Sequence, residues 1–234
     1  MRVQVALGVA LSAFLLVLPF QTLRPVTELG PLEAVAAVSY TWSVWLLARN
    51  HPFGWWIGLV GVAAYGVVFQ QARLFAEVGL QVVYFATSLQ AIWLWLRGGE
   101  RGAERPVSSF PRRYWLPTAA LATLATVGLY ALLTWLRGAV PAWDSVTTVL
   151  SLVAHVLLMG RFVESWWLWI LVDTIYVPLY ASRGLYLTSG LYVVFWFMAI
   201  GGLFEFRRLL AERAVAAGSA AAAPVADRSP EPGP

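Results

Sequence analysis

Residues 165–181, with the sequence SWWLWILVDTIYVPLYA, form an apolar stretch that contains a single charged side chain, Asp173. A helix that crosses a bilayer needs about 20 mostly apolar residues, so this stretch is a candidate transmembrane span. A carboxylate inside a span is costly and usually lines a cavity or pairs with a neighbouring side chain. The stretch therefore predicts a membrane helix whose acid has either a functional or a structural role.

Seven further apolar stretches accompany this one. The chain has 234 residues, 60% hydrophobic and 12% charged, which is too few polar side chains to cover a soluble domain of this length. The expected spans lie near 3–22, 32–48, 54–71, 78–96, 115–136, 145–160, 165–181 and 187–206. The alternative for the first is a signal peptide, because Arg2 precedes it, but no small-residue cleavage site follows Pro19 and Phe20. We expect a retained helix and a protein that lies in the lipid bilayer.

The sixteen basic residues, all Arg, predict the orientation of the chain. If the Arg-rich loop 97–113 is cytoplasmic, twelve Arg lie inside and four outside, in agreement with the positive-inside rule. Both termini are then cytoplasmic, the membrane is the inner cell membrane, and residues 209–234 form a disordered tail. The net charge of +4 is too small and too dispersed to indicate nucleic acid as a partner.

An internal repeat is visible when Trp55 and Trp56 are set over Trp166 and Trp167, an offset of 111 residues. Tyr65 then falls on Tyr176. The fold class expected is an all-α integral membrane bundle of three, one and three helices, built from two parallel repeats. The expected units are an N-terminal segment 1–31, repeats 32–96 and 145–208, a connector 97–144 and the tail 209–234. The alternative is that Trp-rich spans align by chance.

Catalytic and metal-binding motifs are missing. The chain has no cysteine, no phosphate-binding G-x-x-x-x-G-K-[ST] loop and no H-E-x-x-H motif. We therefore expect neither an enzyme nor a resident metal or cofactor, and no ATP hydrolysis by the chain itself. Gly54 and Gly58 form a G-x-x-x-G pair, which favours close helix packing.

Polar and aromatic side chains inside the spans are candidates for a substrate site. Trp166, Trp169, Asp173 and Tyr176 recur at steps of three and four, so they share one helix face. His155 is the only His inside a span, and its similar depth makes a contact with Asp173 a hypothesis. The full candidate set is Trp166, Trp169, Asp173, Tyr176, Gln81, Tyr84, Gln90, His155 and Tyr192.

The segment WDSVTTVLSLVAHVLLMGRFVESWWLWILVD at 143–173 resembles the PnuC family of bacterial nicotinamide riboside transporters, which includes thiamine and riboflavin carriers. The segments 184–195 and 74–85 are similar to that family as well. The resemblance implies a three-one-three fold and energy-independent facilitated diffusion, with the cargo trapped by a cytoplasmic kinase. It also implies substrate contacts from Trp166, Trp169 and Asp173.

The chemistry of these side chains ranks the cargo. Nicotinamide riboside and thiamine carry a cationic aromatic ring, which Trp faces attract by about 2 kcal/mol or more when desolvated, and riboflavin is neutral. We expect nicotinamide riboside first, thiamine second and riboflavin third. The rival functions are a substrate-capture subunit that needs a separate ATPase and, against the motif evidence, a membrane enzyme or sensor. The sequence leaves open whether the chain forms a homo-oligomer.

Overall fold

The computed structural model describes residues 30–71, 75–136, 141–182 and 186–222, and these form helices joined by short connections. The α-helices are α2 (Gly30–Ala48), α3 (Phe53–Gln71), α4 (Phe75–Arg97), α5 (Trp115–Trp135), α6 (Pro141–Met159), α7 (Glu164–Ser182) and α8 (Tyr186–Ala222). Two 3-10 turns, η1 (Glu100–Gly102) and η2 (Arg112–Tyr114), lie between α4 and α5.

Four helical segments of the described chain are long and apolar enough to cross a bilayer: Val78–Arg97, Arg112–Trp135, Pro141–Met159 and Ser189–Ser219. Two shorter apolar helices, Ala34–Ala48 and Phe53–Val68, accompany them. An α-helix satisfies its backbone hydrogen bonds internally, as hydrocarbon requires. The chain is a multi-pass membrane protein. The span expected at 3–22 lies outside the described residues.

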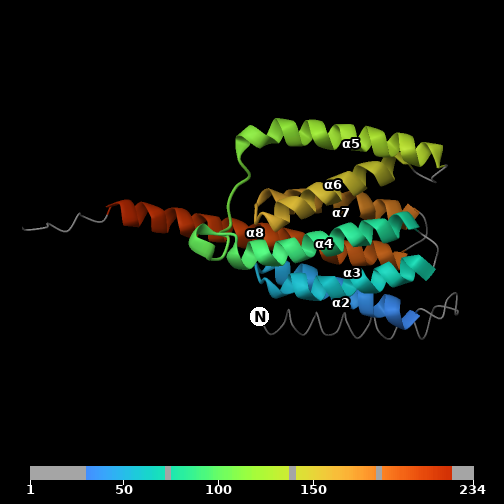
Figure 1. Ribbon diagram of the computed structural model, residues 1–234, viewed down its shortest axis with the longest axis horizontal. Coiled ribbons are helices and arrows are strands. Elements are labelled where there is room, and N and C mark those ends of the chain that lie inside the picture. Colours follow the sequence, from blue (N-terminus) through green and yellow to red (C-terminus); the bar gives the residue numbers. More distant parts are fainter. Residues whose placement is uncertain (1–29, 72–74, 137–140, 183–185, 223–234) are drawn as a thin grey trace, which may run out of the picture.

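The helices other than α5 contact one another in a closed order. Along the chain, α2 packs on α3 and α3 on α4; α4 packs on α6, α6 on α7 and α7 on α8. The contact of α8 with α2 closes the series. Helix α5 packs along α6 and lies apart from the other helices at one edge of the bundle (Figure 1).

Helices α2 and α3 approach closely at two glycines. A Cβ atom placed on Gly54 would lie 2.7 Å from Leu47 Cγ, and one on Gly58 would lie 2.8 Å from Ser43 Oγ. The Ser43 hydroxyl donates a hydrogen bond of 2.8 Å to the Gly54 carbonyl oxygen. The close packing predicted from the G-x-x-x-G pair is therefore confirmed.

The connections α2–α3 and α6–α7 have the same backbone conformation at the offset of 111 residues. Asn50 and Arg161 occupy equivalent positions and are both left-handed, with φ of 56° and 53°. The amide of Asn50 donates to the Leu47 carbonyl, and the amide of Arg161 donates to the Leu158 carbonyl, each at 2.9 Å. The sequence offset thus corresponds to a repeated local structure.

The side chains that follow these turns repeat as well. Trp55 on α3 meets Trp95 on α4 edge-on, with ring centroids 5.7 Å apart. At the offset of 111, Trp166 on α7 meets Phe206 on α8 edge-on at 5.4 Å. These four rings belong to one buried core at the end of the bundle that carries the two turns.

Helix α8 is longer than the sequence analysis anticipated. The expected span ended at 206 and a disordered tail began at 209, but α8 continues as helix to Ala222. The segment 214–222 is rich in Ala, the residue with the highest intrinsic helix propensity, so its helix needs no tertiary partner to form. This correction applies to 209–222, because 223–234 lie outside the described residues.

The segment between α4 and α5 packs against the α6–α7 turn. Ser108 forms a bridge with Phe162, and its amide donates to the Arg161 carbonyl at 3.1 Å. The Phe110 amide donates to the Glu164 carboxylate at 2.8 Å. These bonds hold the Arg-rich loop, which was expected from the sequence to be cytoplasmic, across this end of the bundle.

Candidate substrate site

Hydroxyl and amide groups from α2, α3 and α4 meet inside the bundle. The Tyr40 hydroxyl donates to Gln81 Oε1 at 3.2 Å, and the Tyr40 ring lies 5.4 Å from the ring of Tyr65. Tyr84, one turn further along α4, lies near the same hydroxyl. Gln81 is buried. The cluster combines aromatic surface with groups that can donate or accept hydrogen bonds.

A second cluster occupies the corresponding place on α6, α7 and α8. The rings of Tyr176 and Tyr192 lie 4.7 Å apart, and Thr147 and Ser151 are within hydrogen-bonding reach of the Tyr176 hydroxyl. Its members Ser151, Tyr176 and Tyr192 stand 111 residues after Tyr40, Tyr65 and Gln81. The candidates Tyr176, Tyr192, Gln81 and Tyr84 thus belong to two equivalent polar groups.

His155 on α6 contacts side chains of α3 and α4, the helices that carry part of the first cluster. Its Nε2 lies 3.0 Å from the Thr87 hydroxyl on α4, and its ring meets Trp55 at 5.3 Å and Tyr84 at 5.0 Å. The hypothesis that His155 contacts Asp173 is wrong. The two residues were matched in depth, but the face of α6 that carries His155 is turned toward α3 and α4.

Asp173 is buried in α7, 4% exposed, and has no hydrogen bond or ion pair among the described residues. It lies nine residues beyond Glu164, about 14 Å along the helix at 1.5 Å per residue. Half the thickness of a bilayer core is about 15 Å. A buried acid near mid-membrane, close to Tyr176, is suited to a polar or cationic ligand.

The two Trp residues of the W-x-x-W pattern have different environments. Trp166 is 2% exposed; its indole covers Gly202, where an added Cβ would lie 2.7 Å from the ring. Trp169 is half-buried at the margin of the same core and is one turn closer to Asp173. Gln90 is exposed on α4. Trp166 therefore packs inside the protein core, and Gln90 lies on the exposed surface of α4.

Tyr40, Thr87 and Ser151 were absent from the candidate set. Their hydroxyls are common inside membrane helices and gave no signal alone. The offset of 111 offers one signal in retrospect, because it joins Gln81 to Tyr192 and Tyr40 to Ser151. Within the ranges that the structure describes, no three His, Cys, Asp or Glu side chains gather as metal ligands.

The model of a protein family described as nicotinamide mononucleotide transporter matches residues 30–208 of the chain. That range covers every described helix up to the middle of α8 and includes both polar clusters. The chain belongs to this family. The match also confirms the resemblance to PnuC transporters inferred from the 143–173 segment.

The relatives of this chain include proteins that carry the name nicotinamide riboside transporter PnuC. The protein of Escherichia coli strain K12 is 29% identical over 201 residues, which cover 75% of this chain and 84% of that one. The protein of Neisseria mucosa is 30% identical over 156 residues, covering 64% of this chain and 59% of that one. A riboflavin/roseoflavin transporter of Streptomyces davaonensis, RibM, is 28% identical over 156 residues, covering 63% and 70%.

A crystal structure described as that of the vitamin B3 transporter PnuC has the same fold. It superposes with a TM-score of 0.70 at 24% identity and covers 90% of this chain and 92% of that one. This chain thus shares the helical architecture of that transporter over nearly the whole length of both proteins.

Proposed function

We propose that this protein imports nicotinamide riboside across the inner cell membrane by facilitated diffusion. The observation that carries the proposal is its membership of the family, in which relatives 29% and 30% identical are named nicotinamide riboside transporters. The half-buried Tyr side chains and the buried Gln81 and Asp173 support it, because a riboside needs hydrogen-bonding partners within an otherwise apolar bundle.

The proposed transport unit consists of two parallel repeats, α2–α4 and α6–α8, with α5 as the connector. The matched turns at Asn50 and Arg161 support this division, as do the matched polar clusters. The substrate would lie between the repeats near mid-membrane, and rocking of one repeat against the other would alternate access. Both termini would then be cytoplasmic, in keeping with the Arg distribution.

Roles for the candidate side chains follow from their surroundings. Trp169 would stack on the cationic pyridine ring and Asp173 would attract its charge. Tyr176, Tyr192, Gln81 and Tyr84 would hydrogen-bond the ribose hydroxyls. Trp166, which covers Gly202, would fix the start of α7 and not touch the cargo. His155, held by Thr87, would position α6 beside the first cluster.

Facilitated diffusion alone only equilibrates a cargo. Net uptake therefore needs a reaction that removes free cargo on the cytoplasmic side, and phosphorylation by a kinase is the one that the family resemblance implies. In this proposal the chain needs no ATPase partner and no coupling ion.

Purified protein in sealed liposomes tests the proposal directly. Radiolabelled nicotinamide riboside should enter until its internal and external concentrations are equal, without ATP or an ion gradient. An enclosed nicotinamide riboside kinase with ATP should raise accumulation beyond that limit. If the protein bound nicotinamide riboside but did not move it, the capture-subunit alternative would replace the uniporter.

Riboflavin is the second candidate cargo because the relative at 28% identity is named a riboflavin/roseoflavin transporter. The neutral isoalloxazine ring gains nothing from an ionised Asp173. The same liposomes, challenged with unlabelled nicotinamide riboside, thiamine or riboflavin, separate the candidates, because only the true cargo should compete at low concentration.

A further inference from the structure

An open cavity of about 230 Å³ lies at the surface of the bundle end where the α4–α5 loop packs. It is lined by Asn50, Glu104, Arg105, Pro106, Val107, Arg161, Leu209 and Arg213. It is distinct from the mid-membrane polar clusters, none of whose side chains line it. It is smaller than the roughly 300–1,000 Å³ pockets that enclose drug-sized ligands, so it suits a small group.

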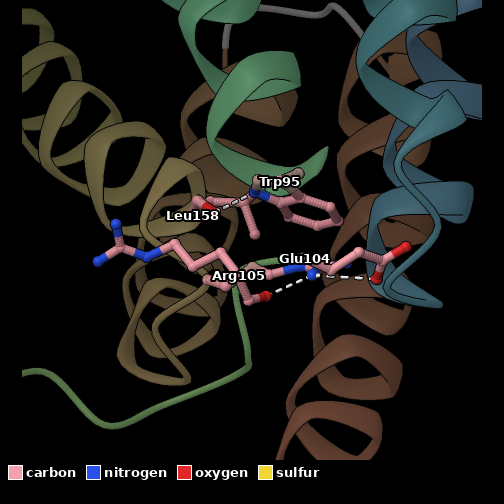
Figure 2. Close-up of polar contacts among 5 residues, drawn as sticks. Trp95, Glu104, Arg105 and Leu158 are labelled. Carbon is pink, nitrogen blue, oxygen red and sulfur yellow. Dashed lines mark hydrogen bonds and ion pairs between the residues drawn. The ribbon is translucent and has the colours of Figure 1, made fainter. Parts of the chain in front are cut away.

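Arg161 is the central charge of this cavity and is 2% exposed. One guanidinium nitrogen donates to the Arg105 carbonyl and lies 3.5 Å from the Glu104 carboxylate, and the guanidinium carbon lies 4.4 Å from the Trp95 ring centroid. Figure 2 shows Glu104 and Arg105 close together beside Trp95. Burial lowers the pKa of Arg161, and Glu104 opposes that shift.

The Nε atom of Arg161 is buried and has no hydrogen-bond partner among the described residues. A buried donor without a partner destabilises the folded protein by about 1–3 kcal/mol, and by more when the group is charged. Such a donor is therefore unusual unless a ligand can bind it. Glu104 satisfies the charge only in part, because its side chain is 66% exposed and occupies one edge of the guanidinium. The guanidinium group of arginine is a frequent partner of phosphates and carboxylates.

Asn50 also lines the cavity, and its Oδ1 is buried without a hydrogen-bond partner among the described residues. The two ends of an amide are interchangeable by a half-turn, so Asn50 can present an acceptor or a donor there. Asn50 and Arg161 are the equivalent left-handed residues of the two repeated turns. The cavity therefore lies between the two halves of the bundle.

The charges around the cavity favour an anion. Arg213 from α8 lines it and donates to the Val107 carbonyl at 3.4 Å. Arg105 turns its guanidinium toward the Gly160 carbonyl, to which its Nε donates at 3.0 Å. Arg105, Arg161 and Arg213 thus line the cavity together with one acid, Glu104. A phosphate monoester, with a charge of about −1.5 to −2 at pH 7, would replace Glu104 as the partner of Arg161.

We propose that this cavity binds the phosphate group of a monoester, which joins Arg161, Arg213 and Asn50 and displaces Glu104. The ligand is either a soluble sugar phosphate or the headgroup of a phosphatidic acid. The site does not depend on the cargo, and its test measures binding without transport. Its failure would leave the proposed uptake function untouched.

Calorimetric titration of the full chain in neutral detergent tests the site. The probes are ribose 5-phosphate, with ribose as its control, and short-chain phosphatidic acid, with short-chain phosphatidylcholine as its control. Glu104→Gln should tighten phosphate binding about tenfold, because it removes the competing carboxylate, and Arg213→Gln should weaken it about tenfold. Glu100→Gln and Arg207→Gln change a neighbouring acid and a basic residue outside the cavity, and should have no effect.

Binding of ribose 5-phosphate with this pattern would support a soluble ligand, and the same pattern with phosphatidic acid alone would support a lipid headgroup. Glu104 is exposed, so its variant keeps the test valid even if Arg213→Gln proves unstable. The proposal is overturned if neither phosphate probe binds, or if neither Glu104→Gln nor Arg213→Gln changes the measured affinity.

Discussion

The Nε2 of His155 on α6 lies 3.0 Å from the hydroxyl of Thr87 on α4, and this contact joins these two helices. The pair is part-buried and is backed by the rings of Trp55 and Tyr84. It therefore fixes the rotation of α6 relative to the first polar cluster.

Removal of the Thr87 hydroxyl should loosen this junction. We expect Thr87→Val to lower the stability of the purified protein by about 1–3 kcal/mol, because the His155 ring nitrogen loses its partner away from water. Thermal unfolding in detergent measures the loss. Thr123→Val on α5, where the hydroxyl bonds only its own helix, is the matched control and should melt like the parent. Equal melting of both variants would contradict a stabilising role for the pair.

Gly202 should tolerate no side chain, unlike its neighbour. A Cβ at Gly202 would lie 2.7 Å from the Trp166 ring, and one at Gly201 meets nothing within 4 Å. We expect Gly202→Ala to destabilise the protein by about 1–3 kcal/mol through overpacking. Gly201→Ala should be neutral or stabilising by up to about 1 kcal/mol, since Ala favours helix. Melting curves of the two variants decide this, and a harmless Gly202→Ala would disprove the tight packing of Trp166.

Trp169 should matter for transport, and Trp167 should not. Trp169→Ala removes the ring proposed to stack on the cargo, so we expect uptake into liposomes to fall at least tenfold with the protein still inserted and folded. Trp167 is 50% exposed on the outer face of α7. Trp167→Ala is therefore the control for loss of a large ring from the same helix. Full uptake by Trp169→Ala would remove this residue from the site.

Asp173 should set the preference for a cationic ring. Charge-assisted contacts contribute about 1.5–3 kcal/mol, so Asp173→Asn should weaken nicotinamide riboside binding by roughly 10- to 100-fold and leave binding of any neutral competitor unchanged. Calorimetry on the purified variant measures both. Glu205→Gln, at a surface ion pair with Arg208 on α8, is the control acid. An unchanged affinity for the cation would show that Asp173 is structural.

The positions of the helices were predictable because a backbone in hydrocarbon must satisfy its own hydrogen bonds, which a helix does. The spans expected from 32 to 181 agree with α2–α7 to within a few residues, and the offset of 111 proved to be a repeat of turns as well as of letters. The pairing of His155 was not predictable. Depth follows from counting residues, but the direction in which a nearly uniform apolar helix turns its side chains depends on its neighbours.

The surroundings of Trp166, Trp169 and Gln90 were also not predictable from the sequence. Trp166 and Trp169 share a face in sequence, yet only Trp166 meets the small Gly202 that lets α8 approach and cover its ring. That difference comes from a residue 36 positions away along the chain. Gln90 was a candidate because it is polar and lies within the span 78–96, but it is on the exposed side of α4.

The match between residues 111 positions apart has a consequence for how a cargo would bind. If two repeats enclose the cargo as proposed, two equivalent walls would accept an elongated molecule in either of two poses, with its head toward one wall or toward the other. Val62 and Asp173 occupy equivalent positions, both buried, and only the second is a carboxylate. This replacement puts an acid on one wall only, so a ring that bears positive charge would enter in a single orientation.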